Sequence, residues 1–318
     1  MPPERSLPRE LLTSSFSVEE ALALGVSPRR LKAADLIRPS RGIRTPELAR
    51  ETLLQRARPY TAIHDTTVLS HLSAAMVHRI PLPSWAQDPT LIDLSRIGAA
   101  APGSKERLGQ PRRPEIRGHR LRLKEDEVAV LEGSKVTTPA RTWLDLCGNR
   151  RLRMDDIIAA GEYLVSQHER TFHRRTAIVP LADLRAYVES RHRVVGLGRA
   201  RIALDLLAVG VDSPQESYLR QMLERAGLPR FIPNCPVVDP WGGVIWVDVG
   251  NVEYRTALEY EGEHHFTEEQ MALDAWRDRR TRASGWNQVK ITKHDMARGE
   301  PYVVRLVVDA LRDHGYRG

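Results

Sequence analysis

Three acidic side chains lie close together in a short stretch toward the C-terminal end of the sequence. Asp248 lies in the apolar run Val244–Val249, and Glu259 and Glu261 lie in or directly after the run Thr256–Tyr260. Short apolar runs bounded by turn residues predict strands, and successive side chains of a strand alternate between its two faces. Glu259 and Glu261 are therefore expected to point to the same side, and Asp248 can join them from the neighbouring strand.

Carboxylates gathered in this way predict a cation site. They repel one another and lose solvation when they are partly buried, and a divalent cation removes both penalties. All-oxygen ligation favours Mg²⁺ or Mn²⁺, which retain water ligands and can activate one of them for attack on a phosphodiester. The metal ligands that this spacing predicts are Asp248, Glu259 and Glu261. Glu216 lies in the first turn of a preceding predicted helix, where the helix dipole favours a carboxylate.

The surrounding segments predict the elements that would position these residues. A helix is expected from Ser213 to about Ala226, with Ser213 as its N-cap. Gly242 and Gly243 are expected to turn the first acidic strand toward the second. The remaining elements are a helix over 268–283, a strand over 288–292 and a helix over 301–313. We expect Arg277 in the first of these helices to bind a phosphate, although a plain solvated charged face is the alternative.

Several motifs follow one another in order over the region 213–318: Ser213-Pro-Gln-Glu216-Ser, Ala226-Gly-Leu-Pro229, Asn234, Val247-Asp248, Leu258-Glu259-Tyr260-Glu261-Gly262, His264-His265, Asp274-x-x-Arg277 and Gly285-Trp286-x-x-Val289. With these motifs the region resembles the endonuclease-like domain related to very-short-patch-repair nucleases, within the PD-(D/E)XK superfamily. The resemblance implies a restriction-endonuclease-like αβββαβ core and metal-dependent hydrolysis of phosphodiester bonds. It also implies that Glu216 joins Asp248, Glu259 and Glu261 as a metal ligand.

One departure from the family pattern affects the expected chemistry. Glu261 stands where the family usually has Asp, and the lysine of the wider superfamily is absent at that position. No ammonium group is therefore expected there, and the proton must be moved by another side chain. The candidates are His264, His265 and Lys290.

Residues 1–58 have the pattern of a winged helix-turn-helix. Ser17 and Glu20 form a capping box that begins a short helix, Gly25 marks a turn, and a second helix is predicted over Arg29–Leu36. Residues 37–44 resemble a small basic wing. A helical hairpin whose charges only face water is the alternative. The expected contacts to DNA are Arg29, Arg30, Lys32, Arg38 and Arg41.

Residues 59–165 form a predicted middle α/β domain, followed by a helical linker over 166–212. Thr138 and Pro139 begin an amphipathic helix in which Trp143 is buried and Arg141 pairs with Asp145. With the N-terminal region, this part loosely resembles AbiEi-type antitoxins of abortive-infection systems. The segments that carry the resemblance are His71-Leu-Ser73-Ala-Ala, Ile80-Pro-Leu-Pro83 and Val136–Leu146. A nucleophile role for Ser73 beside His71 is not favoured, because the sequence offers no acid partner.

Composition limits the remaining possibilities. The 318 residues carry a net charge of +7, and 41% of them are hydrophobic, which is typical of a globular α/β protein that binds a polyanion. The two cysteines support neither a disulfide framework nor a cysteine-based zinc site. The sequence contains no apolar run of about 20 residues, the length that spans a bilayer, so we expect no membrane partner. A cytoplasmic location is expected, and a protein partner or a homodimer is compatible with the sequence.

The sequence leaves two functions from different classes. The first is a DNA-binding protein with a Mg²⁺- or Mn²⁺-dependent nuclease domain, acting in phage defence or DNA repair. The second is a DNA-binding regulator or antitoxin without enzyme activity that retains a nuclease scaffold.

Overall fold

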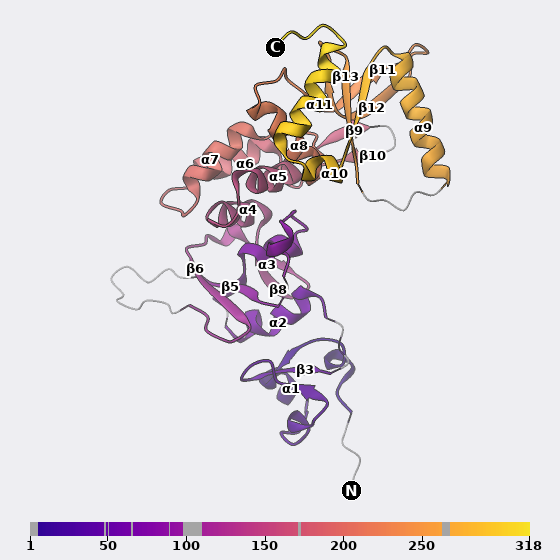
Figure 1. Cartoon of the computed structure of the whole chain (residues 1–318). Helices are drawn as coiled ribbons and strands as arrows, with labels where there is room; N and C mark the ends of the chain where they lie inside the picture. Colours follow the sequence, from indigo (N-terminus) through magenta and orange to yellow (C-terminus); the bar gives the residue numbers. More distant parts are fainter. Residues whose placement is uncertain are drawn as a thin grey trace. The chain divides into compact units, whose positions relative to one another are not determined.

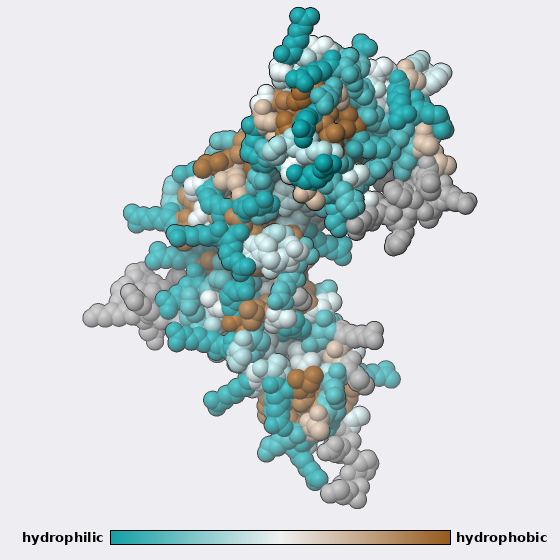
Figure 2. All heavy atoms as spheres, viewed as in Figure 1, coloured by the Kyte–Doolittle hydropathy of each residue, from teal (hydrophilic) through white to brown (hydrophobic). Residues whose placement is uncertain are grey.

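The computed structural model describes residues 6–47, 49, 51–64, 66–88, 90–97, 110–170, 173–262 and 268–318, without the side chains of 173 and 268–271. The chain divides into two compact units of mixed α/β structure (Figure 1). Unit 1 comprises Met1–Leu152 and Arg193–Leu197, and unit 2 comprises Arg153–His192 and Gly198–Gly318. Hydrophilic side chains dominate the face of the molecule drawn in Figure 2. Among the described residues, none of the helices combines the length and the apolar character needed to cross a bilayer.

Unit 1 begins with a small antiparallel sheet and one short α-helix. The strands β1 (Phe16–Ser17), β3 (Ile43–Pro46) and β2 (Leu36–Ile37) are ordered β1-β3-β2, and α1 spans Val18–Ala23. The predicted capping box begins α1: Ser17 Oγ accepts from the N–H of Glu20 at 3.0 Å, and the Glu20 carboxylate accepts from the N–H of Ser17 at 3.4 Å.

The second helix predicted over Arg29–Leu36 is wrong. The structure has only one 3₁₀ turn there, Arg30–Lys32, and the chain then extends into β2. The guanidinium of Arg30 makes two hydrogen bonds to the carboxylate of Asp35, at 2.7 and 2.5 Å. Leu36 is buried and pairs with Pro46 of β3. Sheet pairing and the Arg30–Asp35 contact therefore outweigh the weak helical preference of this segment.

The rest of unit 1 is a five-stranded sheet with helices. Its strand order is β6-β5-β4-β8-β7, with parallel pairs β5–β6 and β4–β8. The strands are β4 (Thr67–Leu69), β5 (Ile92–Ile97), β6 (Ile116–Leu121), β7 (Val128–Leu131) and β8 (Ser134–Thr137), and the helices are α2 (Leu53–Ile63), α3 (His71–Val77) and α4 (Pro139–Cys147). As predicted, Pro139 begins α4, Trp143 is fully buried, and Arg141 pairs with Asp145 at 2.9 Å.

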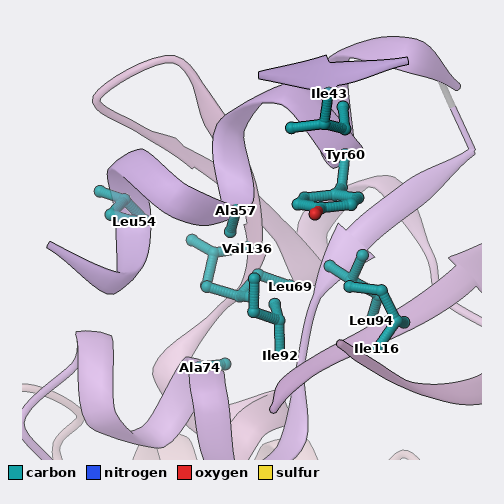
Figure 3. Close-up of a cluster of buried hydrophobic side chains, with 10 residues drawn as sticks. All are labelled: Ile43, Leu54, Ala57, Tyr60, Leu69, Ala74, Ile92, Leu94, Ile116 and Val136. Carbon is teal, nitrogen blue, oxygen red and sulfur yellow. The ribbon is translucent and has the colours of Figure 1, made fainter. Parts of the chain in front are cut away.

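The boundary predicted between residues 58 and 59 lies inside α2, and this helix joins the two parts of unit 1. Ile43 of the small sheet packs in the same buried cluster as Ala57 and Tyr60 of α2 and Leu69 and Val136 of the large sheet (Figure 3). Ile43, which precedes the predicted boundary, packs against side chains that follow it. One hydrophobic core therefore continues across the boundary.

Unit 2 contains a four-stranded sheet with the order β11-β12-β13-β14, in which only the β13–β14 pair is parallel. The elements are α8 (Pro214–Arg225), β11 (Ile232–Val238), β12 (Val244–Asn251), β13 (Thr256–Glu261), α9 (Glu268–Ala283), β14 (Asn287–Thr292), α10 (Lys293–Ala297) and α11 (Glu300–Arg312). Apart from the short α10, this is the predicted order. The predicted role of Gly242 is wrong, because its turn joins β11 to β12, and residues 252–255 join β12 to β13.

The core of unit 2 lies between the sheet and the helices α8 and α11. Leu219, Leu258 and Val307 are fully buried members of this cluster from α8, β13 and α11. Unit 2 also contains α5 (Met154–Val165), β9 (His168–Arg170), β10 (His173–Arg175), α6 (Leu181–Glu189) and all but the first residue of α7 (Leu197–Leu206). The linker predicted over 166–212 is therefore not wholly helical, because β9 and β10 pair with each other as antiparallel strands. Residues 153–165, predicted as the end of the middle domain, belong instead to unit 2, where α5 contacts α8 and Tyr218 of α8 donates to Asp156 of α5 at 3.0 Å.

Candidate metal centre

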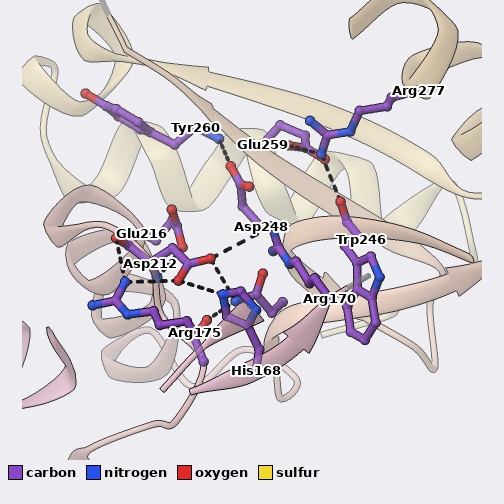
Figure 4. Close-up of polar contacts among 12 residues, drawn as sticks. His168, Arg170, Arg175, Asp212, Glu216, Trp246, Asp248, Glu259, Tyr260 and Arg277 are labelled. Atoms are coloured by element: carbon purple, nitrogen blue, oxygen red, sulfur yellow. Dashed lines mark hydrogen bonds and ion pairs between the residues drawn. The ribbon is translucent and has the colours of Figure 1, made fainter. Parts of the chain in front are cut away.

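Asp248 and Glu259 face each other at one end of the β12–β13 pair. The paired segment ends at Val249 and Leu258, and Asp248 and Glu259 are the next residues on the two strands. Opposing residues of antiparallel strands point to the same face, so the two carboxylates share one side of the sheet. Oδ2 of Asp248 accepts a hydrogen bond from the backbone N–H of Tyr260 at 3.0 Å (Figure 4).

Glu216 reaches this region from the first turn of α8. Ser213 Oγ accepts from the N–H of Glu216 at 3.2 Å, and Oε2 of Glu216 accepts from the N–H of Asp212 at 3.0 Å. The first bond caps the helix at the backbone of Glu216, and the second holds its carboxylate in place, where the helix dipole favours the negative charge. The Glu216 side chain is buried, with 7% of the residue exposed.

Lys290 of β14 forms an ion pair with the carboxylate of Glu261, a residue that we predicted from the sequence to be a metal ligand. Its Nζ lies 2.8 Å from Oε1 of Glu261 and 2.9 Å from Oδ2 of Asp278. Lys290 is also in register with Glu259 across the parallel β13–β14 pair. The expectation that no ammonium group stands beside the site is therefore wrong, since a neighbouring strand supplies one.

Arg277 of α9 contacts Glu259 rather than lying free for a phosphate. Its Nη2 donates to the carbonyl oxygen of Trp246 at 2.8 Å and to the two carboxylate oxygens of Glu259 at 3.4 and 3.5 Å. The guanidinium is 37% exposed, so one side of it still faces solvent. His264 and His265 lie outside the described residues.

Asp212 is the centre of a charged cluster that the sequence analysis missed. His168 and Arg175 contact its Oδ1 at 3.1 Å each, and Arg170 lies 3.8 Å from its Oδ2, which also accepts from Asn234 at 3.1 Å (Figure 4). Burial acts to raise the pKa of Asp212, but the Asn234 amide and the three basic side chains lower it below its ordinary value. The signal in the sequence was the basic stretch 168–175, whose acidic partner lies about forty residues away.

The carboxylates of Glu216, Asp248 and Glu259 affect one another's protonation, because the charge of Asp248 acts on both glutamates. Burial and the charge of Asp248 raise the pKa of Glu259 to about 8 and that of Glu216 to about 7. Burial also raises the pKa of Asp248, against the opposing effects of the Tyr260 N–H and of Arg277 and Arg170. The three groups thus resist carrying three negative charges together, which is the electrostatic condition that a cation relieves.

The carboxylates do not form a closed cage. Within the described part of the chain, no group of three or more His, Cys, Asp or Glu side chains stands close enough to hold a metal ion. Asp248 and Glu259 are two carboxylates on one side of the sheet, and Glu216 lies close enough to interact with Asp248 through its charge.

The expected DNA contacts of unit 1 are divided by the structure into two kinds. Arg29, Lys32 and Arg41 are exposed. Arg30 is held by Asp35, and Arg38, although exposed, donates to the carbonyl oxygen of Lys32 at 2.9 Å. Arg30 is therefore the least suited of the five to a phosphate, since its charge is already neutralised.

The raised pKa of Glu259 predicts how stability depends on pH. A carboxyl with a higher pKa in the folded chain binds more protons when folded, so the free energy of unfolding falls as pH rises between the two pKa values. For Glu259 this interval runs from 4.5 to about 8. In the absence of divalent cations we expect the Tm of unit 2 to fall from about pH 5 to about pH 8, and Glu259→Gln to flatten that decline. Calorimetric scans across this range would measure it.

Glu189→Gln is the matched control, because Glu189 is exposed on α6 of the same unit. It should keep the wild-type pH dependence. If the Tm of Glu259→Gln falls with pH as steeply as that of the wild type, the carboxyl group of Glu259 does not cause the pH dependence.

Comparison with known proteins adds no family assignment. No protein-family model matches the chain, and no curated protein shows significant sequence similarity to it.

Proposed function

We infer that unit 2 is a metal-dependent nuclease domain that hydrolyses phosphodiester bonds, most simply those of DNA, and that unit 1 contributes to binding the nucleic acid. The observation that carries this proposal is the set of three coupled carboxylates, Glu216, Asp248 and Glu259, brought together from α8, β12 and β13. The order of α8, three strands, α9, β14 and α11 supports it, since it is the order expected for a restriction-endonuclease-like core.

The protein's own residues would have distinct tasks. Asp248 and Glu259 would hold Mg²⁺ or Mn²⁺, with Glu216 beside them, and such an ion supplies charge neutralisation and activation of water when it is bound. Arg170 and Arg277 both act on the charge of Asp248, and in this proposal they would exchange part of their present carboxylate contacts for the phosphate that is cleaved. They would bind and orient the substrate backbone rather than move protons.

Lys290 is better suited to electrostatic stabilisation than to accepting a proton. Its hydrogen bond to Glu261 is the main cause that raises its pKa above the ordinary value, so it remains an ammonium ion at neutral pH. The proton acceptor would then be His264, His265 or solvent.

A cleavage assay tests the proposal. Supercoiled plasmid and a single-stranded oligonucleotide are incubated with the full chain in Mg²⁺, in Mn²⁺ and in EDTA. Nicked or linear products that require the metal support a nuclease. Intact substrates under all of these conditions, with a folded protein, contradict it.

The alternative is a DNA-binding regulator or antitoxin without enzyme activity. The observation that favours it is the lack of a three-ligand cluster among the described residues, together with the contacts that already engage Glu259 and Glu261. In that case a folded chain would bind duplex DNA and leave it uncut in either metal.

Both functions predict salt-sensitive DNA binding through unit 1. We expect Arg29→Ala with Lys32→Ala to weaken duplex binding and to reduce the slope of log affinity against log salt by up to about 2, because each lost phosphate contact removes close to one released counterion. Fluorescence anisotropy at several salt concentrations measures the slope. Arg201→Ala with Arg317→Ala removes two exposed charges from unit 2 and should leave the slope unchanged. Equal slopes for the wild type and the first variant would contradict the proposal that Arg29 and Lys32 contact DNA.

A further inference from the structure

Unit 1 contains a cavity of about 710 Å³ that the proposed nuclease function does not use. Residues of α3, β6 and α4 line it, together with the segments 148–151 and 193–195, and all of them belong to unit 1 (Figure 1). The volume lies within the range of roughly 300–1,000 Å³ typical of small-molecule sites.

The cavity wall carries more positive than negative charge. Two of its arginines are engaged: Arg141 pairs with the buried Asp145 at 2.9 Å, and Arg117 lies 3.6 Å from Asp93. Those two aspartates are the only carboxylates among the described residues that line the cavity. Five more lining arginines form no ion pair with any described residue: Arg120, Arg122, Arg150, Arg151 and Arg193.

Two stacked histidines form part of the wall. The rings of His71 and His119 are 3.7 Å apart and tilted by only 13°. His119 is fixed by Asp93, whose Oδ1 lies 2.7 Å from its Nε2, and Nδ1 of His71 lies 2.9 Å from Ser70 Oγ. Burial, followed by the nearby positive charges, holds the pKa of His71 well below its usual value, so this ring is neutral at pH 7.

The backbone of the wall is held in an uncommon conformation at two places. His71 has φ 51° and Arg193 has φ 55°, in the left-handed region that residues with a side chain rarely adopt. Such strain persists where the surrounding structure enforces it, and it gathers at ligand sites. Trp85 also lines the cavity, and the guanidinium of Arg151 lies over its ring at 4.1 Å from the ring centre. Together the two side chains form a planar stack in the wall.

We propose that this cavity binds a phosphorylated small molecule of nucleotide size through its phosphate groups. Arginine presents paired N–H donors that match the oxygens of a phosphate group. Five lining arginines have no carboxylate partner among the described residues, and a ligand with one carboxylate would neutralise only one of these charges. The neutral His71 adds a hydrogen-bonding group without another charge, and the Trp85–Arg151 pair offers a planar surface for a base. The volume accommodates a whole nucleotide rather than one phosphate alone.

Isothermal titration calorimetry of the full chain with ATP tests this proposal. EDTA is included so that the carboxylates of unit 2 take no part through a metal. We expect one ATP per chain, and Arg120→Gln with Arg122→Gln should weaken binding by about tenfold or more. Arg9→Gln with Arg79→Gln removes the same charge from exposed positions of unit 1 outside the cavity, and should change affinity by less than about twofold.

Thermal unfolding establishes that each variant is folded, and Arg150→Gln serves as a second cavity variant if the double change is not. No heat of binding with ATP, or equal losses in the cavity and control variants, overturns the proposal. A single-stranded oligonucleotide of about 12 residues that displaces ATP and binds more tightly also overturns it, because the arginines then serve a nucleic-acid strand. Since the test uses no metal and measures no cleavage, its failure leaves the nuclease proposal untouched.

Discussion

Asp248→Ala is expected to reduce Mg²⁺-dependent cleavage to the background of the assay, a loss of about a thousandfold or more. Asp248 is the carboxylate whose charge acts on both Glu216 and Glu259. Without it, Glu259 loses the second carboxylate that lies beside it at the end of the β12–β13 pair. The measurement is the initial rate of plasmid nicking in Mg²⁺ and in Mn²⁺.

The fold should survive this change. The variant loses the hydrogen bond from the N–H of Tyr260, worth about 1 kcal/mol, but it also loses the repulsion that raises the pKa of two neighbours. Asp309→Ala is the matched control, because Asp309 is 64% exposed on α11 and pairs only loosely with Arg312. If Asp248→Ala cleaves as fast as Asp309→Ala, the assignment of the metal site is wrong.

Arg220→Met is expected to destabilise unit 2 by about 3–5 kcal/mol, because it leaves a buried carboxylate without its cation. Arg220 of α8 is 5% exposed, and it binds the fully buried Glu162 of α5, the Leu206 carbonyl oxygen at 2.8 Å and Glu224 at 2.8 Å. Burial already raises the pKa of Glu162 even with Arg220 present. Urea unfolding at neutral pH would measure the loss.

A second variant separates the buried charge from the packing. Arg220→Met with Glu162→Gln removes both charges and keeps an oxygen that can accept from the N–H of Ala208, which Glu162 now binds at 2.8 Å. We expect it to regain much of the lost stability. Arg174→Met, which breaks the exposed pair with Glu169, should have little effect. A midpoint for Arg220→Met close to that of Arg174→Met would show that the Arg220–Glu162 pair is not a structural requirement.

Most helices and strands of residues 213–318 could be predicted from the sequence because their signals are local. The helix predicted over 268–283 is α9, and the strands predicted around Asp248 and Glu259 are β12 and β13. Ser213 begins α8 and Ser17 begins α1, since a side-chain oxygen three residues before an N–H is enough to cap a helix. These outcomes depend on neighbours within a few positions of the chain.

Pairing over longer distances changed the prediction elsewhere. The segment after Arg29 has helical composition, but burial of Leu36 against β3 decides its conformation. The boundary at residue 58 came from the helix-turn-helix pattern of the N-terminal segment, whereas Ile43 packs in one buried cluster with Tyr60 and thus joins both sides of the boundary. Propensity is a weak preference, and a buried contact made through space outweighs it.

The candidate site shows the same division between residue type and partner. The strands that carry Asp248 and Glu259, and their adjacency, could be predicted from the sequence alone. The partners could not: Lys290 pairs with Glu261, His168 and Arg175 contact Asp212, and His71 stacks on His119 in an arginine-lined cavity. The physical reason is that charge pairing and burial depend on distances between elements, and spacing along the chain does not specify those distances.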